Sequence, residues 1–460
     1  MACGRALGFD RPGAFRRKCA ERPDSRLVYG LAGPLGSRCF ERKACRQALK
    51  IIIMKHGQPL MMHLHGADQR LSLDPRDPAF YLDPYPAYRR LQNEAPVVFW
   101  EQFSRWTFAS HRDVSAILRD RRFGRSLDGV GGVEAQCPIL EVDRHSLLEM
   151  EPPSHTRLRR LVQGAFIARN IEALRPRIEQ LCHELIDRMQ QDERADLLPS
   201  YATPIPVIVI CELLGVPSSM ADQLLDWSHA MVAVYQLARD PQQIDEALTA
   251  EREFVAFLRK YIARRRREPR DDLLSRLIEV EEEGEKLNED ELISTCILLL
   301  NAGHEATVNV IGNGTLALLQ HPEQLERWRR DPSLTATAVE ELLRFDTPLH
   351  LFNRYALDDV SVGGLELERG TEISLLLGAA NRDPGVFDRP DELDLGRAKN
   401  PHVSLGAGLH YCLGAPLARL ELQIALPILL ERLPRLELDE EPTFKDSYHF
   451  RGLESLWLRF

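Results

Sequence analysis

The 460-residue chain has no apolar run that approaches the length of a membrane-spanning helix. Runs such as residues 51–54 and 297–300 fall far short of the ~20 residues that a span needs. Basic residues are also in the minority, with 59 Lys and Arg against 69 Asp and Glu and a net charge of -10. We therefore expect no membrane span. Because nucleic acids are bound by clustered cations, we also do not expect nucleic acid as the main partner. A small molecule or another protein is the expected partner.

Signatures of several other protein classes are missing as well. No CxxC or HxxxH spacing accompanies the cysteines and histidines, as a structural zinc site would need. No GxGxxG stretch precedes a helical pattern, so the chain shows no recognisable flavin or NAD domain. The nine cysteines are odd in number and widely scattered, which favours free thiols in a reducing cytoplasm over a disulfide framework.

The charge is distributed unevenly between the start of the chain and the rest. The first 60 residues carry thirteen Lys or Arg against four acids, a net charge of +9, which leaves -19 for the remainder. An organelle transit peptide, a basic arm for membrane or nucleic acid, and a disordered extension or over-long translated start all fit this segment. Its four cysteines and several Pro and Gly make a poor amphipathic helix, so we favour the last. We predict an N-terminal extension over residues 1–66 and one large domain over 67–460.

The remaining chain predicts a mainly α fold with a small β region. The longest helical pattern, residues 288–319, would extend about 48 Å and is apolar enough to run through the core. Further helices are expected over residues 84–93, 112–119, 154–166, 170–190, 204–214, 218–236, 244–267, 336–345 and 416–432. A hairpin over residues 97–108 and strands over 354–362, 365–368 and 373–376 are expected as well.

One segment points to a specific chemistry, the stretch LGAGLHYCLGAP at residues 405–416. Its cysteine, Cys412, follows two spaced glycines and directly precedes a helical pattern. Free N–H groups and the positive end of the helix dipole favour a thiolate at such a position, and glycines let a flat ligand approach the backbone. A thiolate of this kind can serve as the axial ligand of haem iron. Taken alone, a cysteine near His410 also fits a core thiol or part of a zinc site.

The pattern Gly406-x-Gly408-x-His410-x-Cys412-x-Gly414 resembles the haem-binding loop of the cytochrome P450 family, with Leu405 where the family usually has Phe. The resemblance covers roughly residues 73–460 and looks like the soluble bacterial branch. It implies the family's triangular, mainly α prism around a long central helix. It also implies haem b as the cofactor, with Cys412 as the iron ligand and Gly406 and Gly414 in the haem-binding loop.

Other motifs match the same family in order and spacing. Glu341-x-x-Arg344 resembles the ExxR helix, which in the family joins a later arginine, here Arg397, to support the cysteine loop. Buried haem propionates need cationic partners. The positions that resemble those partners are His155, Arg159, Arg354 and His410.

The central helix contains the stretch AGHEAT at residues 302–307. The resemblance implies that small residues there leave room for dioxygen and substrate, and that Glu305 is the acid that relays protons. Ala306 replaces the family's usual alcohol, and Thr307 lies about 100° further round the helix. We expect a substrate hydroxyl, or water held by Glu305 or Thr307, to replace that alcohol. We interpret His304 as a satisfied or solvent-facing side chain and not as a metal ligand.

The implied activity is that of a haem-thiolate monooxygenase that inserts one atom of dioxygen into an apolar substrate. Electrons would come from a separate ferredoxin or flavodoxin with its reductase, and Arg157, Arg160 and Arg419 are candidate docking charges, unless they form an ordinary solvated basic face. The alternatives are a peroxygenase or isomerase-type P450, which Ala306 makes plausible, and a non-catalytic haem-binding protein.

The substrate itself stays open at this stage, with terpenoid, fatty acid, steroid, polyketide and aromatic compounds as candidates. The segments expected to shape its pocket are residues 123–150, 207–236 and 348–352. Their apolar side chains suit either a pocket or the core: Phe123, Ile139, Leu140, Val232, Val234, Leu349 and Leu351.

Overall fold

The computed structural model describes residues 60–65, 69–127, 140–235, 240–282 and 285–460. Contacts divide the chain between Gly57 and Gln58, and every described residue belongs to the second unit. Most of the predicted extension 1–66 therefore lies outside the described residues. Its described part contains strand β1 (His63–His65), which pairs antiparallel with β2 (Arg70–Ser72). Both strands belong to the seven-stranded sheet described below. A strand of three residues is too short to be predicted from alternation.

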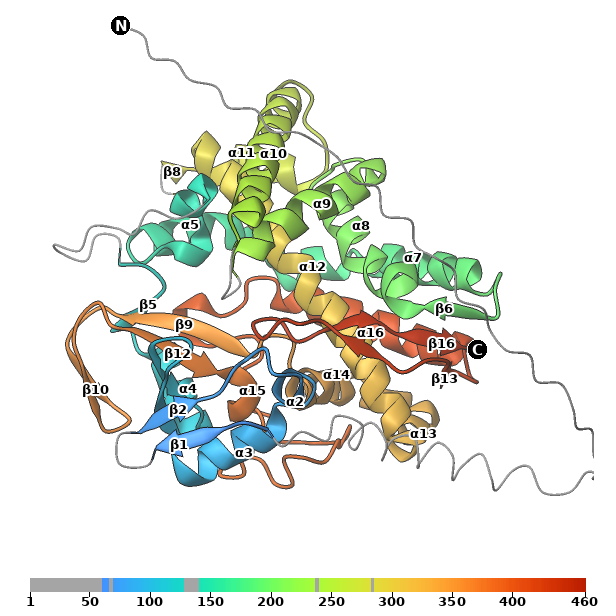
Figure 1. The fold of residues 1–460 in the computed structure, drawn as a ribbon. Helices are drawn as coiled ribbons and strands as arrows, with labels where there is room; N and C mark the ends of the chain where they lie inside the picture. Colours follow the sequence, from blue (N-terminus) through green and yellow to red (C-terminus); the bar gives the residue numbers. More distant parts are fainter. Residues whose placement is uncertain (1–59, 66–68, 128–139, 236–239, 283–284) are drawn as a thin grey trace, which may run out of the picture. The chain divides into compact units, whose positions relative to one another are not determined.

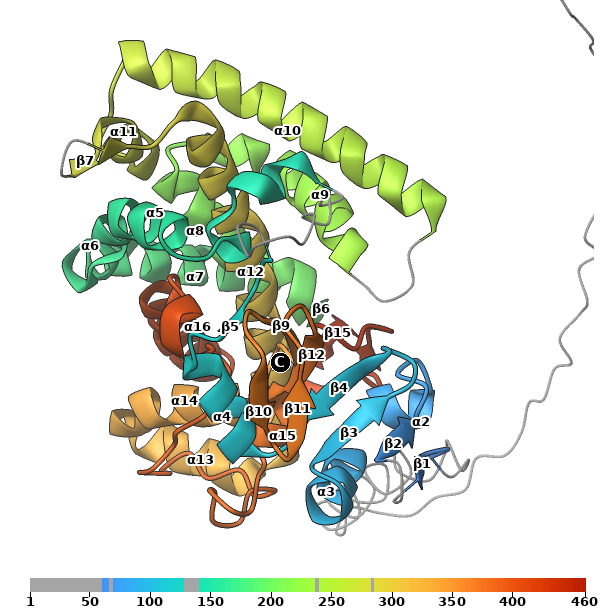
Figure 2. The same ribbon diagram turned by 90° about the vertical axis from the view of Figure 1, so that its left-hand side faces the viewer.

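The long central helix is confirmed as α12 (Glu289–Gln320), with 32 residues. It begins with a capping box, in which the Asn288 side chain accepts from the Glu291 amide at 2.9 Å and the Glu291 carboxylate accepts from the Asn288 amide at 3.0 Å. Helix α12 runs through the helical part of the molecule in Figure 1 and Figure 2. The helices packed against it are α8 (Pro204–Leu213), α9 (Ala221–Val232), α10 (Pro241–Arg267), α14 (Thr335–Phe345) and α16 (Ala415–Arg432).

The other helices follow the predicted pattern with local interruptions. The predicted helix 154–166 gives α5 (Ser154–Gln163) and a 3₁₀ turn that starts at Gly164, where the low helix propensity of glycine tightens the last turn. The predicted helix 170–190 is replaced by α6 (Ala168–Glu172) and α7 (Arg175–Met189), because Pro176 favours a new helix start. The remaining helices are α2 (Pro78–Tyr81), α3 (Tyr85–Glu94), α4 (His111–Arg119), α11 (Leu273–Glu279), α13 (Pro322–Arg330) and α15 (Leu377–Ala380).

A seven-stranded sheet has the order β1-β2-β3-β4-β12-β9-β5. The predicted hairpin is confirmed, because β3 (Val97–Trp100) and β4 (Arg105–Phe108) pair antiparallel. Strand β12 (Glu372–Leu376) lies between β4 and β9 (Leu351–Ala356), with Arg354 opposite Ile373. Strand β5 (Phe123–Gly124) closes the edge.

The prediction of one strand over residues 354–362 was wrong in extent, because this segment contains parts of two strands. Strand β9 ends at Ala356, and β10 (Val360–Val362) pairs instead with β11 (Leu365–Leu367). Two consecutive acids lie between them, and Asp359 accepts a hydrogen bond from the Arg369 amide at 2.9 Å. Aspartate favours turns over strand continuation, so the chain changes partner there.

Near the C-terminus the chain folds back onto the helical core. Strands β13 (Glu437–Leu438), β16 (Trp457–Arg459) and β6 (Arg194–Asp196) form one small sheet, and β14 (Thr443–Phe444) pairs with β15 (Leu453–Ser455) in another. A further pair joins β7 (Glu281–Glu282) to β8 (Glu285–Lys286). The connection between β14 and β15 carries residues 445–452, and Phe450 forms an isolated bridge with Leu349. This connection thereby comes to lie beside the start of β9.

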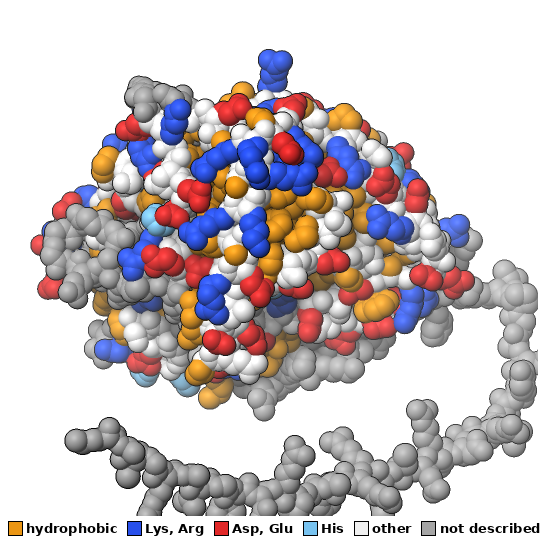
Figure 3. Space-filling view, turned by 90° about the horizontal axis from the view of Figure 1, so that it is seen from above, with side chains coloured by type: hydrophobic (Ala, Val, Ile, Leu, Met, Phe, Trp, Pro, Cys, Tyr) orange, Lys and Arg blue, Asp and Glu red, His pale blue; other side chains and the backbone are white. Residues whose placement is uncertain are grey.

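Helix α10 carries a run of arginines at residues 264–267. Several arginines of this helix are paired with acids, since Arg266 contacts Glu289 at 2.8 Å and Arg264 contacts Glu268 at 3.4 Å. Figure 3, seen from above, shows Lys and Arg side chains beside Asp and Glu with hydrophobic side chains between them. None of the helices in the described ranges is both long and apolar enough to cross a bilayer.

Candidate active site

The loop that carries Cys412 is held in an open shape by its glycines. Gly406 and Gly408 both have a φ of +69°, a backbone conformation that favours glycine. A Cβ at Gly408 would lie 2.3 Å from the Leu118 carbonyl oxygen of α4, so this glycine also permits a close backbone approach. The Cys412 amide donates to the Leu405 carbonyl at 3.0 Å, which closes the loop just before α16.

Cys412 differs from the other cysteines of the described residues. Cys182, Cys211 and Cys296 are buried, and burial raises the pKa of each thiol to about 12. Cys412 is partly exposed as a residue, and a Cβ at Gly414 would be in ordinary van der Waals contact with its Sγ, at 4.0 Å. Among the cysteines of the described residues, Cys412 is therefore the one that is not fully buried.

The expected influence of the helix start on the Cys412 thiol is present, but burial opposes it. Burial raises the pKa of Cys412, although the Gly414 amide and the charges of Arg159 and Arg419 work against it. Desolvation of the charged form outweighs the helix dipole here. A metal ion bound to the sulfur would act in the same direction as these charges, because it deprotonates a coordinating thiol.

The predicted cationic groups include a pair of facing histidines. The rings of His155 and His410 lie 4.5 Å apart between centroids, and His410 Nε2 is 3.0 Å from Glu151 Oε1. His155 is fully buried, and neither of its ring nitrogens has a hydrogen-bond partner within the described part of the chain. Burial lowers the pKa of His155 to about 4, and the charge of His410 adds to this effect. Two unsatisfied buried nitrogens are costly, so they indicate a polar group that the chain itself does not supply.

Arg354 is a second buried group without an anionic partner. It is 1% exposed, donates to the Asn353 carbonyl at 2.9 Å and forms no ion pair in the described ranges. Burial, reinforced by the neighbouring Arg125, lowers the pKa of Arg354 to about 9. The two guanidinium groups lie over the ring of Phe352, at 4.5 Å for Arg354 and 4.6 Å for Arg125. The cluster of cations fits the two carboxylates of a haem propionate pair.

Two residues of this region, one cation and one anion, were missed in the sequence analysis. Arg125 donates to the Asn353 carbonyl at 3.1 Å and pairs with Glu149, and no spacing or motif marks it. Glu151 opens the stretch EPPSHTRLR and was assigned no role, yet it binds His410. Arg159 donates to the Tyr411 carbonyl at 2.7 Å, so it lies beside the cysteine loop. Its assignment to a propionate stays a prediction.

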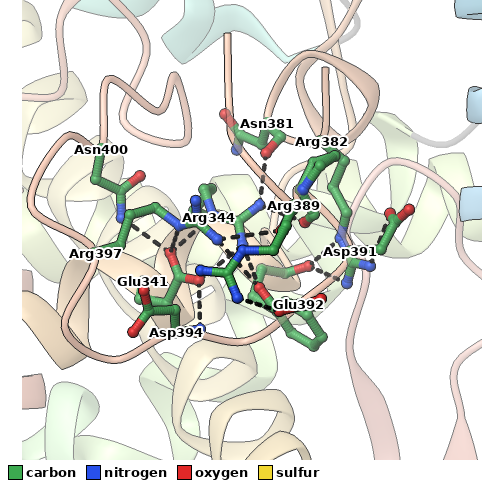
Figure 4. Close-up of polar contacts among 12 residues, drawn as sticks. Glu341, Arg344, Asn381, Arg382, Arg389, Asp391, Glu392, Asp394, Arg397 and Asn400 are labelled. Carbon is green, nitrogen blue, oxygen red and sulfur yellow. Dashed lines mark hydrogen bonds and ion pairs between the residues drawn. The ribbon is translucent and has the colours of Figure 1, made fainter. Parts of the chain in front are cut away.

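The predicted contact between the ExxR pair and Arg397 is confirmed, and Figure 4 shows how these residues converge. Glu341 and Arg344 are both fully buried, and each Glu341 oxygen accepts from Arg344 at 2.8 Å. Arg397 Nε donates to Glu341 Oε2 at 3.0 Å, and Asn400 adds a bond of 3.2 Å. Arg344 also donates to backbone carbonyls, those of Asn381, Pro390 and Glu392. One ion pair therefore fixes the irregular stretch that precedes the cysteine loop.

Glu305 of α12 lines a cavity of about 310 Å³. Lys445 Nζ donates to Glu305 Oε1 at 2.8 Å. Burial acts to raise the pKa of Glu305, but Lys445 outweighs it, so the pKa lies below the usual value. The other residues that line the cavity are His229, Val232, Ala233, Tyr235, Ser447, His449 and Phe450.

The predicted pocket segments are only partly represented in this cavity. Val232 lines it, whereas Phe123, Leu140, Val234 and Leu351 are buried in the hydrophobic core, and Ile139 lies outside the described residues. The contribution of residues 445–450 was missed, because nothing in the sequence of a C-terminal connection indicates where it folds back.

The central stretch of α12 bears on two expectations. A Cβ at Gly303 would lie 2.6 Å from Ile210 Cδ1 of α8, so Gly303 permits close packing of the two helices, and the space for dioxygen stays a prediction. His304 is 1% exposed, so it is not solvent-facing. Its Nδ1 lies 2.9 Å from the Leu300 carbonyl oxygen, whereas its Nε2 has no hydrogen-bond partner among the described residues, so the side chain is only half satisfied. Thr307 is 3% exposed and contacts the buried Glu421 of α16. Ala306 is partly exposed.

Comparisons with known proteins agree with this arrangement. A family model described as Cytochrome P450 matches residues 135–456. The polyketide biosynthesis cytochrome P450 PksS of Bacillus subtilis is 40% identical over 417 residues, which cover 87% of this chain and 98% of that protein. The 6-deoxyerythronolide B hydroxylase of Saccharopolyspora erythraea is 38% identical over 397 residues, 83% of this chain and 97% of that protein. A crystal structure of P450BioI in complex with hexadec-9Z-enoic acid ligated acyl carrier protein superposes with a TM-score of 0.78 at 38% identity, covering 83% of this chain and 99% of that one.

Proposed function

The chain belongs to the cytochrome P450 family, whose members are haem-thiolate monooxygenases, and on this premise we propose that it inserts one oxygen atom from dioxygen into an apolar small molecule. The observation that carries the proposal is that the Cys412 loop occurs together with two buried groups whose partners are missing from the described part of the chain: both ring nitrogens of His155 lack a hydrogen bond, and Arg354 lacks an ion pair. A chain that only bound haem would need no acid at the wall of a cavity, yet Glu305 lines one.

The family's cofactor is haem b, and the residues present fit it. Cys412 would hold the iron, and His155, His410, Arg354 and Arg125 would pair the propionates. When bound, the haem supplies dioxygen binding and O–O cleavage, which a thiolate ligand favours by electron donation. The Glu341 and Arg344 pair would support the cysteine loop through the irregular stretch that precedes it.

We assign the delivery of protons to Glu305. Its carboxylate lies at the cavity wall, where solvent-derived protons can reach it, and Lys445 holds Oε1. Ala306 brings no hydroxyl, and Thr307 contacts Glu421 instead, so we propose that a substrate hydroxyl or an ordered water completes the path.

For the substrate we propose an apolar skeleton that carries oxygen functions, of the polyketide or long acyl type. The cavity combines apolar lining from Val232, Ala233 and Phe450 with hydrogen-bonding groups such as Tyr235 and Ser447. The relatives named for polyketide biosynthesis, for 6-deoxyerythronolide B and for an acyl carrier protein complex support the same class. The proposed location is the cytoplasm, where reduced thiols persist.

A separate ferredoxin or flavodoxin with its reductase is the proposed electron donor. The three arginines predicted to dock this donor are less available to a partner than expected, because each pairs with an acid of the chain itself. Arg419 contacts Glu340 at 2.6 Å, Arg160 lies 4.0 Å from Glu285, and Arg157 pairs with Glu291. Docking would therefore rely on shape and on the remaining surface more than on these three cations.

The test is a spectral-shift screen on the purified haem protein, with macrolactones, fatty acids, acyl carrier protein thioesters and steroids as probes. A type I shift with the first three, followed by an oxygenated product that needs NAD(P)H and a redox partner, is the expected result. Product formation with hydrogen peroxide alone would instead favour a peroxygenase, the alternative that Ala306 supports. The absence of a thiolate-type Soret band in the reduced, carbon monoxide-bound protein would refute haem-thiolate chemistry altogether.

A further inference from the structure

Beside the cavity, two histidines and one carboxylate converge from two helices. His304 and Glu305 belong to α12, and His229 belongs to α9, which packs against α12. Glu305 Oε2 lies 3.6 Å from His304 Nε2 and 3.9 Å from His229 Nε2. One ligand atom from each of the three side chains falls within 4.8 Å of the other two.

The hydrogen bonds of His304 define which of its nitrogens is available. His304 Nδ1 lies 2.9 Å from the Leu300 carbonyl oxygen, which can only accept, so Nδ1 carries the proton and donates. His304 Nε2 is then a bare acceptor, and it is buried without a partner in the described ranges. It faces the Glu305 carboxylate, which is also an acceptor. Two facing acceptors repel each other unless a cation lies between them.

The two carboxylate oxygens of Glu305 have different partners. Oε1 accepts from Lys445 at 2.8 Å, while Oε2 faces both imidazoles. Lys445 therefore fixes the carboxylate and leaves Oε2 free, as hydrogen bonds from outer residues do for metal-ligating carboxylates. The Leu300 carbonyl orients His304 in the same way.

We propose that His229, His304 and Glu305 form a binding site for a divalent cation of the zinc class, with its fourth position open to the cavity. Two imidazoles and one carboxylate are a zinc donor set, whereas Ca²⁺ and Mg²⁺ take oxygen ligands. Bonds of about 2.0–2.2 Å in tetrahedral geometry place ligand atoms roughly 3.3–3.5 Å apart. The two histidines lie 3.6 and 3.9 Å from Glu305 Oε2 and within 4.8 Å of each other, so the site needs a closure of up to about 1.5 Å. The half-exposed His229 side chain on α9 can supply this closure by a change of rotamer.

An occupied site would join α9 to α12 and hold the carboxylate that we assign to proton delivery. The cation would thus act as a reversible inhibitor. This consequence rests on the proposed monooxygenase function, whereas the binding itself does not.

The experiment uses the purified full-length haem protein, freed of other metals by dialysis against a chelator. Calorimetric titration with Zn²⁺ should give one site per chain in the wild type. His229→Ala and His304→Gln should each weaken binding at least about tenfold, since even outer-shell changes cost that much. His183→Ala, an exposed histidine on α7, is the matched control and should leave binding unchanged. X-ray absorption at the zinc edge should show nitrogen and oxygen neighbours at about 2.0–2.2 Å, with weaker imidazole scattering in His229→Ala.

Equal affinity in all four proteins would mean an adventitious ion only, and no binding in the wild type would mean that the three side chains do not form a cation site; either result overturns the site. In turnover assays, Zn²⁺ should suppress product formation in the wild type and do so at least about tenfold less potently in His229→Ala. If zinc binds as described but no product ever forms, the proposed function fails and the site stands.

Discussion

Thr307 of α12 lies against the buried carboxyl group of Glu421 of α16, so a polar contact joins the two helices inside the core. Glu305, two residues earlier, lines the cavity. Two residues correspond to about 200° around an α-helix, so the two side chains point to opposite sides. The hydroxyl of Thr307 and the carboxylate of Glu305 therefore contact different neighbours.

Glu421 should make the protein less stable as the pH rises. Burial raises the pKa of Glu421 to about 8, although the Thr307 hydroxyl partly offsets the effect. The unfolded chain releases this proton near pH 4.3, so between about pH 4.3 and 8 the folded state holds one proton more, and the unfolding free energy falls by up to about 1.4 kcal/mol per pH unit. In Glu421→Gln this contribution is removed. Urea unfolding of both proteins should be measured at pH 5, 6, 7 and 8. The unfolding free energy of Glu421→Gln should rise relative to that of the wild type as the pH rises. The same pH dependence in both proteins would contradict the raised pKa of Glu421.

Replacement of Glu305 by Gln should lower product formation at least about tenfold, because general acid catalysis by one group typically contributes more than that. Haem content and the carbon monoxide spectrum should not change. Asp222→Asn, on the exposed side of α9, is the control and should keep full activity. Product formed per NAD(P)H consumed is the measurement, and an unaffected Glu305→Gln variant would exclude the relay.

Ala306→Thr should raise the share of electrons that ends in product, because the new hydroxyl can order the water that brings protons. Peroxide release and product are measured together against NAD(P)H consumption. Unchanged coupling, with low peroxide release already in the parent, would contradict the proposal that the missing hydroxyl has to be replaced.

Glu341→Gln should destabilise the protein by about 3–5 kcal/mol and reduce haem retention, since it leaves the buried cation of Arg344 without its partner. Glu326→Gln is the matched control. Glu326 also pairs with an arginine three residues on, Arg329, but its side chain is 51% exposed. Its loss should cost less than about 1 kcal/mol. Similar unfolding midpoints for the two variants would contradict a supporting role for the buried pair.

Cys412→Ala should abolish the thiolate-type Soret band of the reduced, carbon monoxide-bound protein. Cys182→Ala, which removes a fully buried thiol of α7, should keep that band. If Cys412→Ala retained it, another cysteine would have to be the ligand.

The sequence alone predicted those parts of the molecule that depend on neighbouring residues. The 32-residue α12 follows from capping and apolar periodicity, which act over a few residues. The cysteine loop and the Glu341–Arg344 pair are short local motifs as well, but their roles were implied by the family resemblance. Arg397 could be predicted only through the family resemblance, and its bond to Glu341 is confirmed.

Only the tertiary structure decided which side chains meet across long separations. Lys445 reaches Glu305 over 140 positions of the chain, and Arg125 reaches the Asn353 carbonyl over 228. His229 faces His304 because α9 packs on α12, and Gly303 is turned to α8 because Ile210 lies there. Such contacts are set by how whole elements pack, and packing is a property of the complete core that no local pattern encodes.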